Sequence, residues 1–82
     1  MVNAHVVKLL TQAKTLCGQS LSQDVVKQVS GIQLELAAIA SQSVDFDRKP
    51  TEFEDLFISW IYGRETMTVT EFAARIANRK EE

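Results

Sequence analysis

The sequence predicts an all-α protein, a compact bundle of about four helices. Two capping boxes carry this prediction, Thr51-x-x-Glu54 and Thr68-x-x-Glu71. In a capping box the threonine hydroxyl accepts a hydrogen bond from the third helical N–H, and the glutamate carboxylate accepts one from the threonine N–H. Two earlier stretches repeat apolar residues at helical spacing. We expect residues 1–82 to form one domain, whose thin core favours association as a helical dimer.

The first helix is predicted at about residues 4–17. Asn3 is its expected N-cap, and Gly18 is expected at C′, the first position beyond the helix end. One face is apolar and the other polar, which is typical of a helix that covers a core. The apolar positions are Val6, Leu9, Leu10, Ala13, Leu16 and Cys17.

The second helix is predicted at about residues 22–42, with Ser20 or Ser22 as its N-cap. Gly31, in its middle, allows three interpretations: a tolerated cost of about 1 kcal/mol relative to alanine, a close helix crossing, or a break into two shorter helices. The main apolar stripe alternates spacings of four and three residues, as in a short coiled-coil contact. It consists of Val25, Val29, Ile32, Leu36 and Ile39.

Residues 43–50 form the predicted connection to the second half of the chain. Val44 and Phe46 are expected to alternate inward and to fix this connection to the core. The residue before a proline is disfavoured in helical geometry, so Pro50 should end the connection directly before the Thr51 cap.

The third helix is predicted at about residues 52–62, ended by Gly63 at C′. It is apolar on more than one side and carries four of the six aromatic residues of the chain. Because such a helix is usually buried between layers, we expect it at the centre of the fold. Its broad apolar face contains Phe53, Leu56, Phe57, Trp60 and Ile61.

The fourth helix is predicted at about residues 69–79, followed by a frayed tail at residues 80–82. Met67 and Phe72 have the spacing of a hydrophobic staple around the Thr68 cap. Together the four helices predict a main core of Leu9, Leu10, Ala13, Val29, Ile32, Leu36, Phe53, Leu56, Phe57, Trp60, Phe72 and Ile76.

The charge balance and the single cysteine limit the possible partners and compartments. The formal net charge is −2, so no overall positive field attracts nucleic acid or an anionic membrane. Cys17 has no disulfide partner in the chain, which favours a reducing, cytoplasmic location. Lys8 interrupts the first apolar run, so we expect no signal peptide. No stretch approaches the roughly 18 apolar residues of a membrane span.

The sequence predicts no catalytic, cofactor-binding or metal-binding residues, and hence no enzyme. His5 and Cys17 lie twelve residues apart on one predicted helix, about 18 Å along its axis, so they cannot form a catalytic dyad. The segment that starts at Asp45 resembles the beginning of a calcium loop. It has Pro50 in place of the required glycine and Leu56 in place of the final glutamate, which excludes that site.

Acidic residues gather at the start of the third predicted helix. Carboxylates in a first helical turn are stabilised by the helix dipole, which explains this cluster without a function. The alternative interpretation is a docking surface for a basic partner. The cluster consists of Asp45, Asp47, Glu52, Glu54 and Asp55.

Surplus apolar surface predicts a protein–protein interaction module that acts as a regulatory or accessory factor. The second and third helices each have a second apolar side, containing Val26 and Leu34 in one and Ile58 and Tyr62 in the other. A thin bundle cannot bury every such side, and exposed apolar area marks association surfaces. We expect these four residues to contact another protein or a second copy of the chain.

The alternative is a DNA-binding regulator of the helix-turn-helix type, built from the last two helices. The fourth helix would then present Thr70, Arg75, Asn78 and Arg79 to the DNA. A connection of about six residues exceeds the usual three or four. The chain also lacks the basic surplus that phosphate contacts require.

Overall fold

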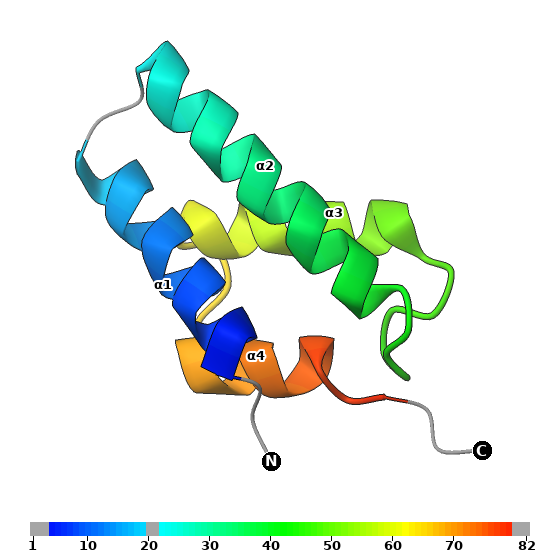
Figure 1. Cartoon of the computed structure of the whole chain (residues 1–82). Coiled ribbons are helices and arrows are strands. Elements are labelled where there is room, and N and C mark those ends of the chain that lie inside the picture. The colour runs from blue at the N-terminus through cyan, green and yellow to red at the C-terminus, as the bar shows by residue number, and fades with distance from the viewer. Residues whose placement is uncertain (1–3, 20–21, 80–82) are drawn as a thin grey trace.

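A computed structural model of the chain describes residues 4–19 and 22–79. Four helices account for most of these residues, and the predicted all-α bundle of about four helices is confirmed (Figure 1). None of the helices in the described part of the chain is both long and apolar enough to cross a bilayer. The helices are α1 (Ala4–Gln19), α2 (Gln23–Ala40), α3 (Pro50–Ile61) and α4 (Val69–Ile76).

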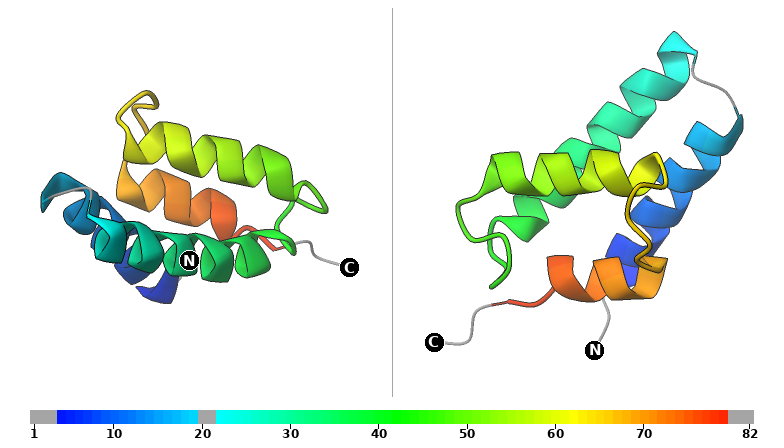
Figure 2. Two further views of the ribbon diagram at one scale, coloured as in Figure 1. Left: turned by 90° about the horizontal axis from the view of Figure 1, so that it is seen from above. Right: turned by 180° about the vertical axis from the view of Figure 1, so that it is seen from behind.

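The four helices pack as a pair of longer helices covered by two shorter ones. The pair consists of α1 and α2, and both of its members contact α3 and α4. Figure 2 shows α3 against one side of this pair, and Figure 1 shows α4 across the end at which α1 begins. This arrangement surrounds one core but leaves the outer flanks of α2 and α3 facing solvent.

Aromatic rings join α3, α4 and the connection between α2 and α3. The Phe53 ring lies 5.3 Å from the Phe46 ring and 6.1 Å from the Phe72 ring, measured between centroids. The Trp60 ring lies 5.2 Å from the Phe72 ring, and its Nε1–H donates to the Met67 carbonyl oxygen at 2.7 Å. The rings of Phe53, Phe57 and Trp60 thus occupy the interior. The prediction that α3 is buried between two layers is wrong, because its second apolar side is exposed at Ile58 and Tyr62.

Nine of the twelve residues predicted for the main core are buried, while Val29, Ile32 and Leu56 are partly buried. Several buried positions were absent from that prediction. Small residues and residues in connections are hard to assign by helical spacing alone. The additional buried positions are Val6, Val25, Ala40, Ser43, Phe46 and Ala73.

The two predicted capping boxes have different outcomes. At Thr68 the box is confirmed, because its hydroxyl accepts from the Glu71 N–H at 3.1 Å and its N–H donates to the Glu71 carboxylate. At Thr51 the prediction is wrong. The helix begins two residues earlier, at Pro50, after Lys49, which caps it without a side-chain hydrogen bond. Proline is favoured at this first position because its φ is already helical and it has no N–H to satisfy.

The other helix starts and ends follow local backbone chemistry. Ser22 caps α2 as predicted, accepting from the Val25 N–H. Gly63 ends α3 as predicted, with φ of 75° and N–H groups of residues 63 and 64 donating to the carbonyls of residues 60 and 59. Gly18 does not end α1, which continues to Gln19. The predicted caps Asn3 and Ser20 and the predicted frayed tail lie outside the described residues.

Helix α2 is continuous through Gly31, so the predicted alternative of a break is wrong. A β-carbon added at Gly31 would meet no atom within 4 Å, which also excludes a close helix crossing there. The remaining interpretation, a tolerated glycine, agrees with this geometry.

Helix α4 ends at Ile76, three residues before its predicted end. The chain leaves the helix because residues 78 and 79 pair with the connection after α2. The Val44 N–H donates to the Asn78 carbonyl oxygen at 2.7 Å, and Ser43 forms an isolated antiparallel bridge with Arg79.

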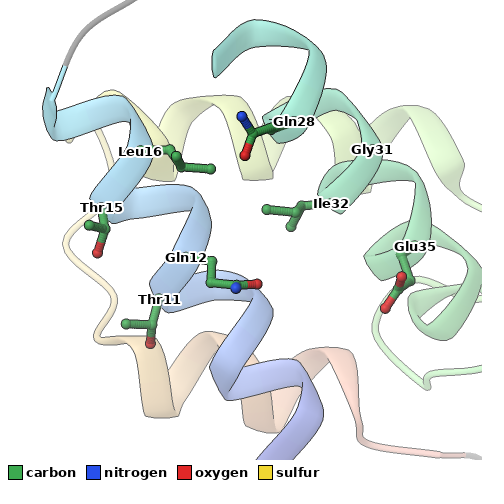
Figure 3. A pocket seen from close by; sticks show the side chains of 8 residues that line it. All are labelled: Thr11, Gln12, Thr15, Leu16, Gln28, Gly31, Ile32 and Glu35. Carbon is green, nitrogen blue, oxygen red and sulfur yellow. The ribbon is translucent and has the colours of Figure 1, made fainter. Parts of the chain in front are cut away.

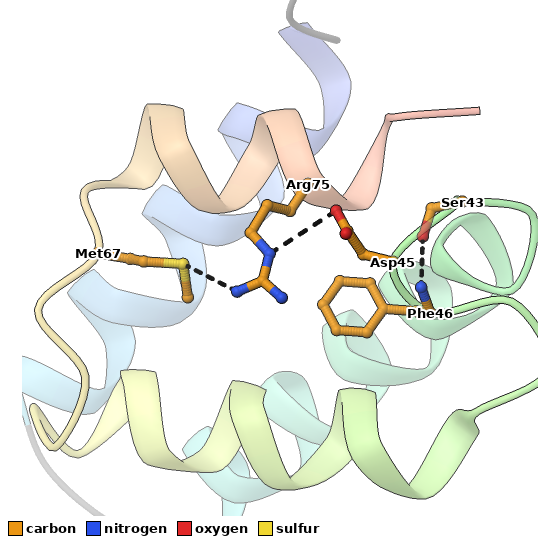
Figure 4. Close-up of polar contacts among 5 residues, drawn as sticks. All are labelled: Ser43, Asp45, Phe46, Met67 and Arg75. Atoms are coloured by element: carbon orange, nitrogen blue, oxygen red, sulfur yellow. Dashed lines mark hydrogen bonds and ion pairs between the residues drawn. The ribbon is translucent and has the colours of Figure 1, made fainter. Parts of the chain in front are cut away.

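The 43–49 loop covers the core beside α4 (Figure 4). Phe46 is buried, as predicted, but the prediction that Val44 also faces inward is wrong, because Val44 is exposed. The buried Ser43 hydroxyl accepts from the Phe46 N–H at 3.0 Å, which turns the loop so that the two side chains do not alternate as in a strand.

Candidate functional site

Four of the largest exposed apolar side chains are those that the sequence assigned to an interface. Their exposed fractions are 51% for Val26, 68% for Leu34, 43% for Ile58 and 59% for Tyr62. Val26, Ile58 and Tyr62 line one hollow of about 270 Å³ between α2 and α3. The structure therefore brings three of these residues together in one place.

Helix geometry explains why these three residues meet. Ile58 on α3 and Tyr62, the C-cap residue of α3, are four residues apart and lie on one flank, as Val26 and Ser30 do on α2. The two flanks face each other with the helices in antiparallel sense, because the early residues of α2 share a hollow with the late residues of α3.

A second hollow of about 130 Å³ adjoins the first and shares Val29, Ser30, Phe57 and Ile58 with it. We refer to the two together as the α2–α3 groove. Buried Phe57 connects its floor to the core. Its remaining lining residues are Cys17, Val25, Val26, Gln33, Glu54, Ile61 and Tyr62.

Leu34 lies outside the α2–α3 groove. Eight residues separate it from Val26, which at about 100° per residue places the two side chains about 80° apart around the helix. Leu34 thus faces outward, away from both α1 and α3. The prediction placed Leu34 and Val26 together on a second apolar side of this helix. In the structure that side is divided, because Val26 lines the groove and Leu34 faces outward.

Among the residues that the structure describes, Glu54 is the only charged one that lines the α2–α3 groove. The predicted places of Glu54, in a capping box and in the first turn of the helix, are both wrong, because α3 begins at Pro50. The spacing of four residues between Glu54 and Ile58 could nevertheless have placed both side chains on the same flank of the helix, since residues at i and i+4 share a flank.

The Cys17 thiol contributes an apolar surface to the groove rather than a nucleophile. Burial raises the pKa of this thiol above its ordinary value, so it stays protonated at neutral pH. His5 lies at the other end of α1, about 18 Å along the axis, with its Nε2 atom 2.6 Å from the Glu35 carboxylate. Within residues 4–19 and 22–79 no three side chains of His, Cys, Asp or Glu gather as metal ligands.

A larger and more polar hollow of about 620 Å³ opens between α1 and α2 (Figure 3). Gln12 and Gln28 point into it above partly buried Ile32. Of its described lining residues only Glu35 is charged, and Glu35 already contacts His5. This hollow was not foreseen from the sequence, because most of its lining residues are polar and only Leu16 and Ile32 belong to predicted apolar stripes.

The residues of the DNA-binding alternative do not share a helix. Thr70 and Arg75 lie on α4, whereas Asn78 and Arg79 follow its end. Arg75 also has intramolecular contacts (Figure 4): its Nε is 3.7 Å from Asp45 Oδ2, and its Nη1 is 3.7 Å from Met67 Sδ. Its guanidinium carbon lies 5.3 Å from the centre of the Phe46 ring. Only two of the four residues assigned to DNA contact therefore lie on α4, and the Arg75 side chain contacts the 43–49 loop.

Comparison of the chain with protein-family models, with curated proteins and with solved structures gave no match.

Proposed function

We propose that this chain is a non-catalytic interaction module that binds another polypeptide in the α2–α3 groove and acts as a regulatory or accessory factor. The observation that carries the proposal is the group formed by Val26, Ile58 and Tyr62, which are about half exposed and line one hollow. Single exposed apolar residues are ordinary on protein surfaces, whereas contiguous ones mark association sites.

The shape of the groove favours a helix as the bound element. Its walls are two helices, and an amphipathic helix can place its apolar face between them, as in other helix-in-groove complexes. Tyrosine at the rim supplies a large contact area with little loss of conformational entropy. The bound polypeptide is either another protein or a second copy of the chain. A cytoplasmic location, which keeps Cys17 reduced, belongs to the same proposal.

Two charged substitutions test the proposal. Ile58→Asp places a carboxylate in the groove and should weaken association, while Leu34→Asp makes the same change outside the groove and should leave it intact. We expect both variants to keep the wild-type helical content by circular dichroism, because both side chains are exposed.

The measurements are solution mass across a concentration series and capture of partners from a lysate of the source cells. Loss of a complex in Ile58→Asp but not in Leu34→Asp supports the proposal. The proposal is contradicted if the wild-type chain stays monomeric and the Ile58→Asp variant captures the same partners as the wild type.

A further inference from the structure

The proposed function leaves the occupant of the α2–α3 groove open, and the geometry points to one class. We infer that the groove binds an amphipathic helix of a different polypeptide, with Lys or Arg where that helix meets Glu54. This inference rests on the proposed function and adds the chemistry of the partner. Three observations carry it: the length of the groove, the lack of an ion-pair partner for Glu54 among the described residues, and the absence of a cation among the described lining residues.

The groove is about two helical turns long. On α2 its lining runs from Val25 to Gln33, and on α3 from Glu54 to Tyr62. Eight residues of helix span about 12 Å at a rise of 1.5 Å per residue. A bound helix therefore fills the groove with apolar side chains at positions i, i+3 or i+4, and i+7.

Glu54 has no structural task within the described chain. Because α3 begins at Pro50, its first turn contains Glu52, and Glu54 and Asp55 fall in the second turn. The stabilising effect of a helix dipole decreases beyond the first turn. The ion pairs among the described residues join His5 with Glu35 and Arg75 with Asp45, so neither Glu54 nor Asp55 takes part in one.

A basic side chain on the partner would complete this end of the groove. Covering Glu54 with an apolar surface would remove water from its carboxylate without replacing that water by a donor, which is unfavourable. A Lys or Arg that follows the last apolar contact of the partner would instead pair with Glu54, with Asp55 one residue further along α3.

A second copy of the chain docked groove to groove does not supply that cation from its described lining residues. In a two-fold symmetric contact the same surface is used by both subunits. Among residues 4–19 and 22–79, none that lines the α2–α3 groove is basic, so a second groove would place no described positive side chain against Glu54. The charge of the groove thus favours a different, basic polypeptide over self-association.

The test is a selection from a displayed library of 14-residue helical peptides in which the surface positions are randomised. Peptides are selected on the wild-type chain, and those that also bind the Ile58→Asp variant are removed. We expect the remaining peptides to combine apolar residues at i, i+3 or i+4, and i+7 with Lys or Arg at one end.

The outcomes separate the inference from the function on which it rests. Groove-dependent peptides without a basic end, or with an acidic one, overturn the inference and leave the interaction function standing. If the selection yields no groove-dependent peptide, both the function and the inference fail.

A charge reversal at Glu54 gives a second measurement on the selected peptides. Glu54→Lys should weaken their binding about tenfold at low salt, and the loss should shrink as salt is raised. Glu52→Lys is the matched control, since it makes the same charge change in the first turn of α3 and outside the groove. Equal losses in both variants would show a general charge effect and overturn the inference.

Binding can be followed at the groove itself. Cys17 is the only cysteine of the chain and lines the groove, so a bound peptide should slow its reaction with a maleimide. The slowing should occur in wild type and Glu52→Lys, and should be reduced in Glu54→Lys at the same peptide concentration. If a tightly bound peptide leaves the rate of maleimide reaction at Cys17 unchanged, the peptide binds outside the groove and the inference is overturned.

Discussion

Two edges of the core differ in how they are covered. Beside α4, the 43–49 loop inserts the Phe46 ring, and Arg75 lies over that ring from the outside. Between α2 and α3, no segment of the described chain lies over the apolar rim of the groove, and Ile58 and Tyr62 remain exposed. In this fold, a helix flank beside the core is thus covered where a connection crosses it and exposed where no described segment does.

The covered edge is also held by directional bonds, whereas the α2–α3 groove is held by packing. Backbone atoms of Val44 and Asn78 are hydrogen-bonded, and the Ser43 hydroxyl fixes the turn of the loop. The lining of the groove contains Ser30 and Gln33 among mostly apolar neighbours. We therefore expect substitutions at the covered edge to change stability, and substitutions at the groove to change association.

The largest expected difference between the two edges is in side-chain truncation. Phe46→Ala should lower the free energy of unfolding by about 3–5 kcal/mol, because it removes a buried ring and leaves a cavity beside Phe53. Ile58→Ala, in the groove, should cost less than about 1 kcal/mol, because the side chain is 43% exposed. Urea unfolding measures both. Equal costs would show that the groove is part of the core rather than a surface.

A serine at each edge gives the next comparison. Ser43→Ala removes the acceptor of the buried Phe46 N–H and should cost about 1–3 kcal/mol in the free energy of unfolding. Ser30→Ala, in the exposed lining of the groove, should change it by less than about 0.5 kcal/mol. Thermal and urea unfolding of the two variants check the difference. A silent Ser43→Ala would mean that the loop is not held by this bond.

The two threonines that begin α4 and α3 give a smaller and matched comparison. Thr68→Ala removes an observed capping box and should cost about 1 kcal/mol. Thr51→Ala should lie within about 0.5 kcal/mol of wild type, because Thr51 is a second helical position without a capping bond. Urea unfolding of both variants distinguishes them. If Thr51→Ala lowers the free energy of unfolding as much as Thr68→Ala does, the capping box predicted at Thr51 is supported after all.

The sequence was a good guide wherever a signal is local. Ser22, Gly63 and Thr68 act within one helical turn, so their chemistry can be read from neighbouring residues. The cap predicted at Thr51 was wrong because two local signals conflicted, and the helix begins at Pro50 rather than after a threonine cap. Helical spacing likewise placed Ile58 and Tyr62 on a second side of α3.

The rest depends on contacts between distant segments, which helical spacing does not contain. Pairing of residues 43 and 44 with residues 78 and 79 ended α4 early and left Val44 outside. The groove needed the antiparallel packing of α2 on α3 to bring Val26 to Ile58 and to separate it from Leu34. The sequence therefore predicted three apolar members of the site, Val26, Ile58 and Tyr62, but neither their grouping in one hollow nor the Glu54 carboxylate beside them.

The smallest expected difference concerns one ionic side chain at each edge. Arg75→Gln should lower the free energy of unfolding by about 0.5–1 kcal/mol, because a half-exposed ion pair with Asp45 and a contact with the Phe46 ring are lost. Glu54→Gln should leave it unchanged, since Glu54 has no partner among the described residues and its carboxylate is exposed. Urea unfolding at two salt concentrations measures both variants.

The Arg75 variant also addresses the DNA-binding alternative. If Arg75 serves the loop, pairing Arg75→Gln with Asp45→Asn in a double-mutant cycle should show a coupling of about 0.5 kcal/mol. Salt-sensitive binding of a DNA duplex by the wild-type chain, lost in Arg75→Gln without any change in unfolding, would instead assign this cation to nucleic acid. The covered edge would then be a second functional surface, and the contrast between the two edges would no longer separate stability from association.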